Sequence, residues 1–238
     1  MDIFQLINIY VHVIFGGLLL VLGIIPMAFP KGSYWHKRIG RLYVSLYAVV
    51  LATAILGVIF FRSQPALMAI TLAALYGYLS GTQSLKIKSS GPQIIDNLMA
   101  VGAIIISASM LIIMSRNGSA SWSPVMGYSV IGITITHAFY DLSRNFWIAI
   151  WTKKIWPIDH GYKMIGSYFA LASAGSGNLI RDFQPWSQIG PSIIGVIVSA
   201  VFIYLYFKHP NSLMSRKNMK LGRDEKPQIH NLQVKRFK

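Results

Sequence analysis

A long apolar run from Ile3 to Phe29 reads IFQLINIYVHVIFGGLLLVLGIIPMAF and indicates the fold class. It contains no Asp, Glu, Lys or Arg, and a helix rising about 1.5 Å per residue over this length can cross about 30 Å of hydrocarbon. Asp2 stands where a secretory signal would carry basic residues, and the apolar run is longer than a signal requires. We therefore expect a retained transmembrane helix here.

Six more uncharged or weakly charged stretches follow, so the sequence predicts an all-α, polytopic transmembrane helix bundle of seven spans. They are Leu42–Phe61, Gln64–Leu85, Asn97–Ser115, a stretch from Trp122 to as far as Trp151, Met164–Leu179 extended back toward His160, and Ser187–Phe207. Only 12% of the residues are charged, about half the share of a soluble domain. We expect one transmembrane domain over residues 1–207, followed by a tail over residues 208–238.

The distribution of basic residues predicts the orientation. Arg62, Arg116 and Arg181 fall on one side of the seven spans, and the other 19 of the 22 Lys and Arg residues fall on the opposite side. The positive-inside rule then places the N-terminus outside and the C-terminus inside. Four tryptophans are expected at the inner interface and two at the outer one: Trp35, Trp147, Trp151 and Trp156 inside, Trp122 and Trp186 outside.

The net charge of +15 comes largely from the tail and the inner membrane face. The tail carries nine basic and two acidic residues with little apolar content, so we expect it to be disordered. Basic segments next to a bilayer are attracted to anionic lipid. The predicted partner of this charge is therefore the lipid surface, and not nucleic acid.

Four of the six histidines lie in or at the ends of the predicted helices: His12, His36, His137 and His160. His12 precedes His36 by 24 residues and His137 precedes His160 by 23. The stretches 37–40 and 163–166 also resemble each other, which predicts a parallel internal repeat. Such a repeat would place His12 with His137 in an outer layer and His36 with His160 in an inner layer.

Two layers of paired imidazoles suit a transmembrane dihaem protein, because neutral histidines are axial ligands of b-type haem. Gly16 and Gly40 follow His12 and His36 at i+4, which leaves space on the same helix face. Four basic residues are candidates for contacts with haem propionates or lipid headgroups: Lys37, Arg38, Arg41 and Lys163. The leading hypothesis is electron transfer through non-covalent haem b. Its alternative is that each histidine only bridges two helices by a hydrogen bond.

A second pattern combines His137, Asp141 and Arg144, which lie at i, i+4 and i+7 of one predicted helix and share a face. A carboxylate beside an imidazole fixes its tautomer and raises its basicity, which serves a proton relay as well as a metal ligand. This pattern supports a proton-coupled carrier or channel. The other interpretation is an internally satisfied Asp141–Arg144 pair in a structural or accessory membrane protein.

Several short motifs recur along the chain: Gly16-Gly17 after His12, Lys31-Gly32-Ser33, the block HKRIGRLY over 36–43, KMIGSY over 163–168 after His160, and Asn178. Together they resemble an uncharacterised family of predicted bacterial multi-pass membrane proteins, over most of the chain except the tail. The resemblance implies a location in the bacterial inner membrane and carries no activity. Lys163 stands where this pattern leads us to expect Arg, which weakens the case for a bidentate contact there.

Overall fold

The computed structural model describes residues 2–61, 65–117 and 124–209, and within them it contains helices and no β-strand. The long helices are α1 (Ile3–Ala28), α2 (Tyr34–Phe60), α3 (Pro65–Lys86), α4 (Ile94–Asn117), α5 (Pro124–Ser143), α7 (Trp156–Leu179) and α8 (Trp186–Lys208). Short elements are η1 (Arg144–Phe146), α6 (Ile148–Ile150), the π-helical turn η2 (Trp151–Ile155) and η3 (Arg181–Phe183). The predicted all-α class is confirmed for these residues.

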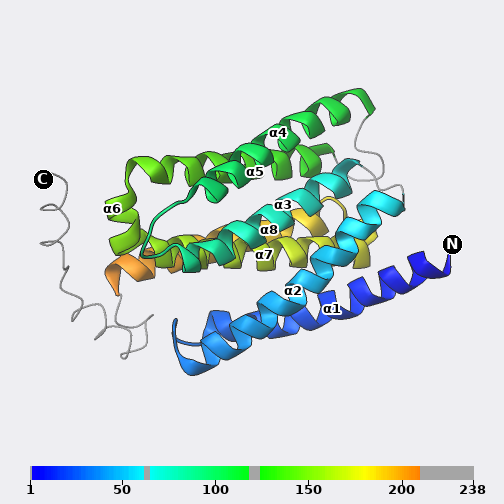
Figure 1. Ribbon diagram of the computed structural model, residues 1–238. Helices are drawn as coiled ribbons and strands as arrows, with labels where there is room; N and C mark the ends of the chain where they lie inside the picture. Colours follow the sequence, from blue (N-terminus) through cyan, green and yellow to red (C-terminus); the bar gives the residue numbers. More distant parts are fainter. Residues whose placement is uncertain (1, 62–64, 118–123, 210–238) are drawn as a thin grey trace, which may run out of the picture.

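Successive long helices run in opposite directions, so the bundle has two ends (Figure 1). One end holds the turns from α1 to α2 and from α3 to α4, together with α6 and the end of α8. Lys31 lies in the first of these turns, Lys88 in the second, and Lys153 and Lys154 in η2 next to α6. We call this the basic end. Residue 2 and the start of α1 lie at the opposite end, which we call the far end.

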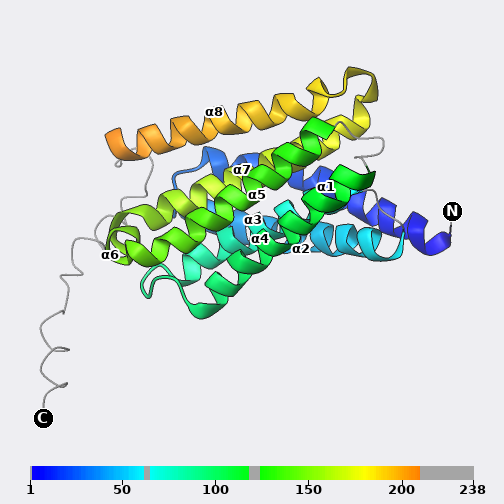
Figure 2. The same cartoon turned by 90° about the horizontal axis from the view of Figure 1, so that it is seen from above.

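Helices α3 and α7 occupy the middle of the bundle. In Figure 1, α4 and α5 lie on one side of them, and α1 and α2 lie on the other. Helix α3 packs on α2, α4, α5 and α7, whereas α7 packs on α1, α3 and α8. Figure 2 shows α8 along one outer edge of the bundle. Residues that meet between α3, α5 and α7 are therefore surrounded by protein.

The outer helices are compatible with a membrane protein. Among the described residues, α1, α2, α4 and α8 are long and apolar enough to cross a bilayer. Their outward-facing side chains are apolar and exposed: Phe4 is 70% exposed, Ile94 79% and Val196 69%. Water-soluble proteins rarely expose large continuous apolar surfaces of this kind to water, whereas contact with lipid exposes no apolar surface to water.

Three helix boundaries differ from the sequence prediction, and one of them is the start of α7, which lies at Trp156 rather than between His160 and Met164. Helix α2 begins at Tyr34, eight residues before the predicted Leu42, because the Ser33 hydroxyl caps it by accepting a hydrogen bond from the His36 amide (3.3 Å). Helix α5 ends at Ser143, eight residues before the furthest predicted limit at Trp151. The chain then turns through η1, α6 and η2 before α7 begins.

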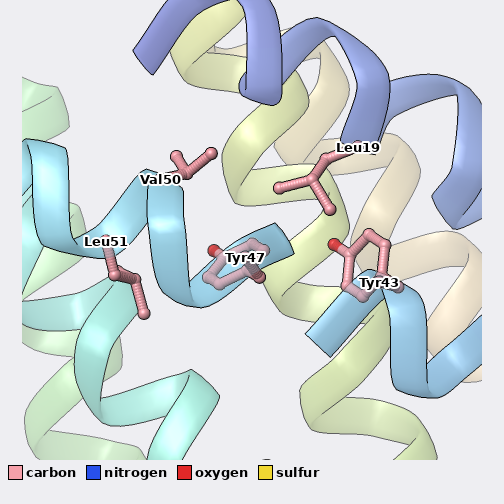
Figure 3. Close-up of a cluster of buried hydrophobic side chains, with 5 residues drawn as sticks. All are labelled: Leu19, Tyr43, Tyr47, Val50 and Leu51. Atoms are coloured by element: carbon pink, nitrogen blue, oxygen red, sulfur yellow. The ribbon is translucent and has the colours of Figure 1, made fainter. Parts of the chain in front are cut away.

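A cluster of buried side chains joins α1 to α2 (Figure 3). Leu19 comes from α1, and Tyr43 and Tyr47 are among the residues from α2 that pack with it. The Tyr47 hydroxyl donates to the Ser167 carbonyl oxygen of α7 at 3.4 Å. This bond and the packing of Tyr168 against the same cluster fix α2 beside α7, and the two helices run in the same direction.

Candidate functional site

Four charged side chains meet in the interior of the bundle: Asp141 of α5, Arg144 of η1, and Asp159 and Lys163 of α7. Each of these side chains is at most 3% exposed. Two are acidic and two are basic, so their formal charges cancel. We call these four residues the ionic cluster.

Each base of the ionic cluster contacts both acids. The Lys163 Nζ lies 2.6 Å from Asp141 Oδ1 and 2.7 Å from Asp159 Oδ1, the second contact being an ion pair without hydrogen-bond geometry. The Arg144 guanidinium places Nη2 3.3 Å from Asp141 Oδ1 and Nη1 2.9 Å from Asp159 Oδ2. Neither base therefore depends on a single carboxylate.

Helix α3 presents a row of hydroxyls to the two carboxylates. Tyr76 donates to Asp141 Oδ2 at 2.7 Å, and Ser80 donates to the same oxygen. One turn further, Ser84 donates to Asp159 Oδ2 at 3.0 Å. These three hydroxyls lie four residues apart on one helix face. Hydroxyl side chains at this spacing on a predicted membrane helix are the sequence signal from which the row could have been predicted.

Two aromatic rings enclose the positive charges. Trp151 is fully buried, donates through Nε1 to Asp159 Oδ2 at 3.1 Å, and places its ring centroid 5.3 Å from Arg144 Cζ. The ring of Tyr140 lies 5.4 Å from Lys163 Nζ. Such cation–π contacts strengthen when water is excluded. Trp151, which the sequence placed at the membrane interface, instead covers the ionic cluster from the basic end.

The structure shows where two residues selected from the sequence, Lys163 and Arg144, lie at this site. Lys163 was a candidate for propionate or lipid contacts, but its amine is buried between the two carboxylates because Asp159 and Lys163 share a helix face at i and i+4. Arg144 does contact Asp141, yet its shorter ion pair is with Asp159, which the sequence analysis did not select. The turn at η1 directs Arg144 inward toward α7.

His137 lies beside the ionic cluster and outside it. Its Nε2 bonds the Tyr162 hydroxyl, and the two rings meet edge to face with centroids 5.1 Å apart. His12 instead bonds the Thr53 hydroxyl through Nδ1 at 2.9 Å. Helix α1 packs on α2 and α7 while α5 packs on α3 and α4, on the other side of the bundle (Figure 1). His12 and His137 thus have different hydrogen-bond partners, on helices that pack on different neighbours, and their predicted pairing stays a prediction.

His36 and His160 both lie at the basic end. The Nδ1 of His36 bonds the Pro26 carbonyl oxygen, and the Nδ1 of His160 bonds the Gly81 carbonyl oxygen, each at 2.9 Å. Three basic side chains near His36 are exposed: Lys37, Arg38 and Arg41. Their positions agree with the predicted contacts to lipid headgroups or propionates, which stay a prediction.

Among the residues that the structure describes, no group of three or more His, Asp or Glu side chains is placed to hold a metal ion. Within the ionic cluster, the two acids and the two bases balance one another in formal charge. Comparisons of the chain with family models, curated proteins and solved structures found no match. Its function is inferred from the geometry above.

Proposed function

We propose that this protein moves protons across a membrane through the ionic cluster, as a proton-coupled carrier or channel. The observation that carries the proposal is that two buried bases are each shared by two buried carboxylates. Ionisable groups are costly within a membrane, and those that occur there typically line ion or proton pathways.

Sharing of the bases lowers the cost of changing the charge of the cluster. When Asp141 takes up a proton, Lys163 and Arg144 both keep Asp159 as a partner. In an isolated buried pair, the same event would leave one base uncompensated, which costs about 3–5 kcal/mol. The ionic cluster is therefore suited to exist with and without one extra proton.

A pathway to Asp141 starts on the side of the far end. Helix α5 runs from the far end to the basic end, so His137 lies one turn nearer the far end than Asp141. The hydrogen-bonded His137 and Tyr162 can pass a proton between imidazole and hydroxyl. On the basic side, Trp151 covers Asp159. We assign proton entry to His137, proton binding to Asp141 and exit to movement of Trp151.

The orientation within the proposal follows the charges. We propose seven spans in the bacterial inner membrane, with the far end outside and the basic end in the cytoplasm against anionic lipid. Helices α3, α5 and α7 have 22, 20 and 24 residues, which is long enough to span. Helices α5 and α7 carry three members of the ionic cluster, Asp141, Asp159 and Lys163, and α3 carries hydroxyls that bond the two carboxylates.

Proton flux into liposomes tests the proposal. Purified protein is reconstituted with a pH-sensitive dye inside, and a potassium gradient with valinomycin makes the interior negative. We expect acidification well above that of protein-free liposomes, and at least a tenfold lower rate for Asp141→Asn. Asp182→Asn is the matched control, because Asp182 is exposed in η3, away from the ionic cluster.

Two results would contradict the proposal. One is wild-type flux no greater than that of empty liposomes. The other is an Asp141→Asn variant that elutes as a single folded species and conducts protons like the wild type. Either result would favour the structural alternative, in which the ionic cluster only holds α3, α5 and α7 together.

A further inference from the structure

The two histidines at the basic end are held in the same way. A carbonyl oxygen can only accept a hydrogen bond, so Nδ1 must be the donor in both His36 and His160. In the neutral imidazole, the lone pair then lies on Nε2. A backbone carbonyl that fixes Nδ1–H and orients the ring is the usual support of a metal-ligating histidine.

Counted along their helices, His36 and His160 lie at about the same depth in the bundle. Tyr43 of α2 and Tyr168 of α7 both press on Gly23, where an added Cβ would lie 2.8 Å from Tyr43 and 2.5 Å from Tyr168. His36 lies seven residues before Tyr43 and His160 eight before Tyr168, which is about 11 and 12 Å along two helices of the same direction. The bond from the Tyr47 hydroxyl of α2 to the Ser167 carbonyl oxygen of α7 holds these two helices side by side.

The donor set matches one class of ligand. Two imidazoles supply two ligands, whereas protein zinc sites use three or four. Haem iron takes four nitrogens from its macrocycle, and a six-coordinate, low-spin b-type haem takes two axial histidines from the protein. Gly40 lies one turn beyond His36, and an added Cβ there would meet no atom within 4 Å. Exposed Lys37 and Arg41 on the same helix can pair with propionates.

We propose that His36 and His160 are the axial ligands of a single b-type haem at the basic end of the bundle. Neither histidine belongs to the ionic cluster, so this site does not depend on proton movement. His12 bonds Thr53 and His137 bonds Tyr162, and the proposal gives neither a part in this site.

Haem titration of the purified full-length protein tests the site. Addition of ferric haem is expected to give one low-spin haem per chain, with a shifted Soret band and a sharp α band after dithionite. His36→Gln and His160→Gln should each lower haem affinity at least tenfold and abolish the low-spin spectrum, because glutamine can still donate to the carbonyl but offers no imidazole. His12→Gln and His137→Gln are matched controls that should keep the wild-type spectrum.

Rescue separates ligation from folding. In His36→Gly, free imidazole in the buffer should restore the low-spin spectrum, which a purely structural role of His36 would not predict. The proposal is overturned if wild-type protein leaves the spectrum of free haem unchanged. It is equally overturned if all four glutamine variants bind haem alike, or if only His12 and His137 matter.

Discussion

Lys163 connects the two acids of the ionic cluster more closely than any other side chain, with its Nζ within 2.7 Å of an oxygen of each. It also donates to the Ser80 hydroxyl at 2.6 Å, which ties α7 to α3. Removal of a single buried partner is costly because the remaining charges cannot be solvated. The stability of the centre of the bundle should therefore depend on this amine.

Lys163→Met tests this dependence at the residue scale. Two buried carboxylates would then share only Arg144, and we expect a loss of about 3–5 kcal/mol in the free energy of unfolding. Thermal unfolding in detergent measures it, with exposed Lys153→Met as a control expected to stay within about 0.5 kcal/mol of wild type. The double variant with Asp141→Asn should lose less than the sum of the two single losses. Equal midpoints for Lys163→Met and Lys153→Met would contradict the ionic cluster.

Helices α7 and α8 pack closely because each carries a glycine that faces a phenylalanine of the other helix. An added Cβ on Gly161 of α7 would lie 2.5 Å from Phe202 of α8, and one on Gly195 of α8 would lie 2.6 Å from Phe169 of α7. Close approach through small residues is a common way for helices to pack within a membrane, where helix association gains little from the hydrophobic effect.

Gly161→Ala tests this packing at the element scale. The new methyl group must displace the Phe202 ring, and overpacking of this kind costs about 1–3 kcal/mol, so the unfolding midpoint should fall. Gly132→Ala is the matched control, because a Cβ there meets no atom within 4 Å and α5 should gain slightly from the better helix former. A Gly161→Ala variant as stable as Gly132→Ala would show that α8 is not packed in this way.

At the scale of the whole molecule, the ionic cluster changes how the charge asymmetry is counted. Arg144 and Lys163 are buried and neutralised by two aspartates, so they do not act at the membrane surface. Of the 19 basic residues on the predicted inner side, 17 remain against three on the other side. The orientation predicted by the positive-inside rule is therefore unaffected.

Reporter fusions test this orientation. A reporter that is active only outside the cytoplasm should be active when fused after Arg62 or Arg116, and inactive when fused after Lys88 or within residues 208–238. Expression of each fusion, checked by immunoblotting, is the control. The reverse pattern would invert the assignment of both ends and with it the direction of proton entry.

The sequence by itself determined the helices and one local contact. Uncharged runs bounded by basic residues are a local property, and the boundaries of α1, α3, α4 and α8 fall within a few residues of the predicted ones. The Asp141–Arg144 contact was also within reach, since residues three apart on one turn are neighbours wherever the helix packs.

Only the tertiary structure decided which residues share a site. In the sequence, the stretch that contains Trp151, Asp159 and Lys163 looks interfacial because it includes Lys153 and Lys154. In the structure the chain turns through η1 and η2 before α7 begins, and all three side chains are buried. The predicted repeat pairs His12 with His137, but the two residues lie on helices that pack on different neighbours. The physical reason is that periodicity gives distances along one helix, whereas the rotation of that helix and its choice of neighbour depend on packing across the whole bundle.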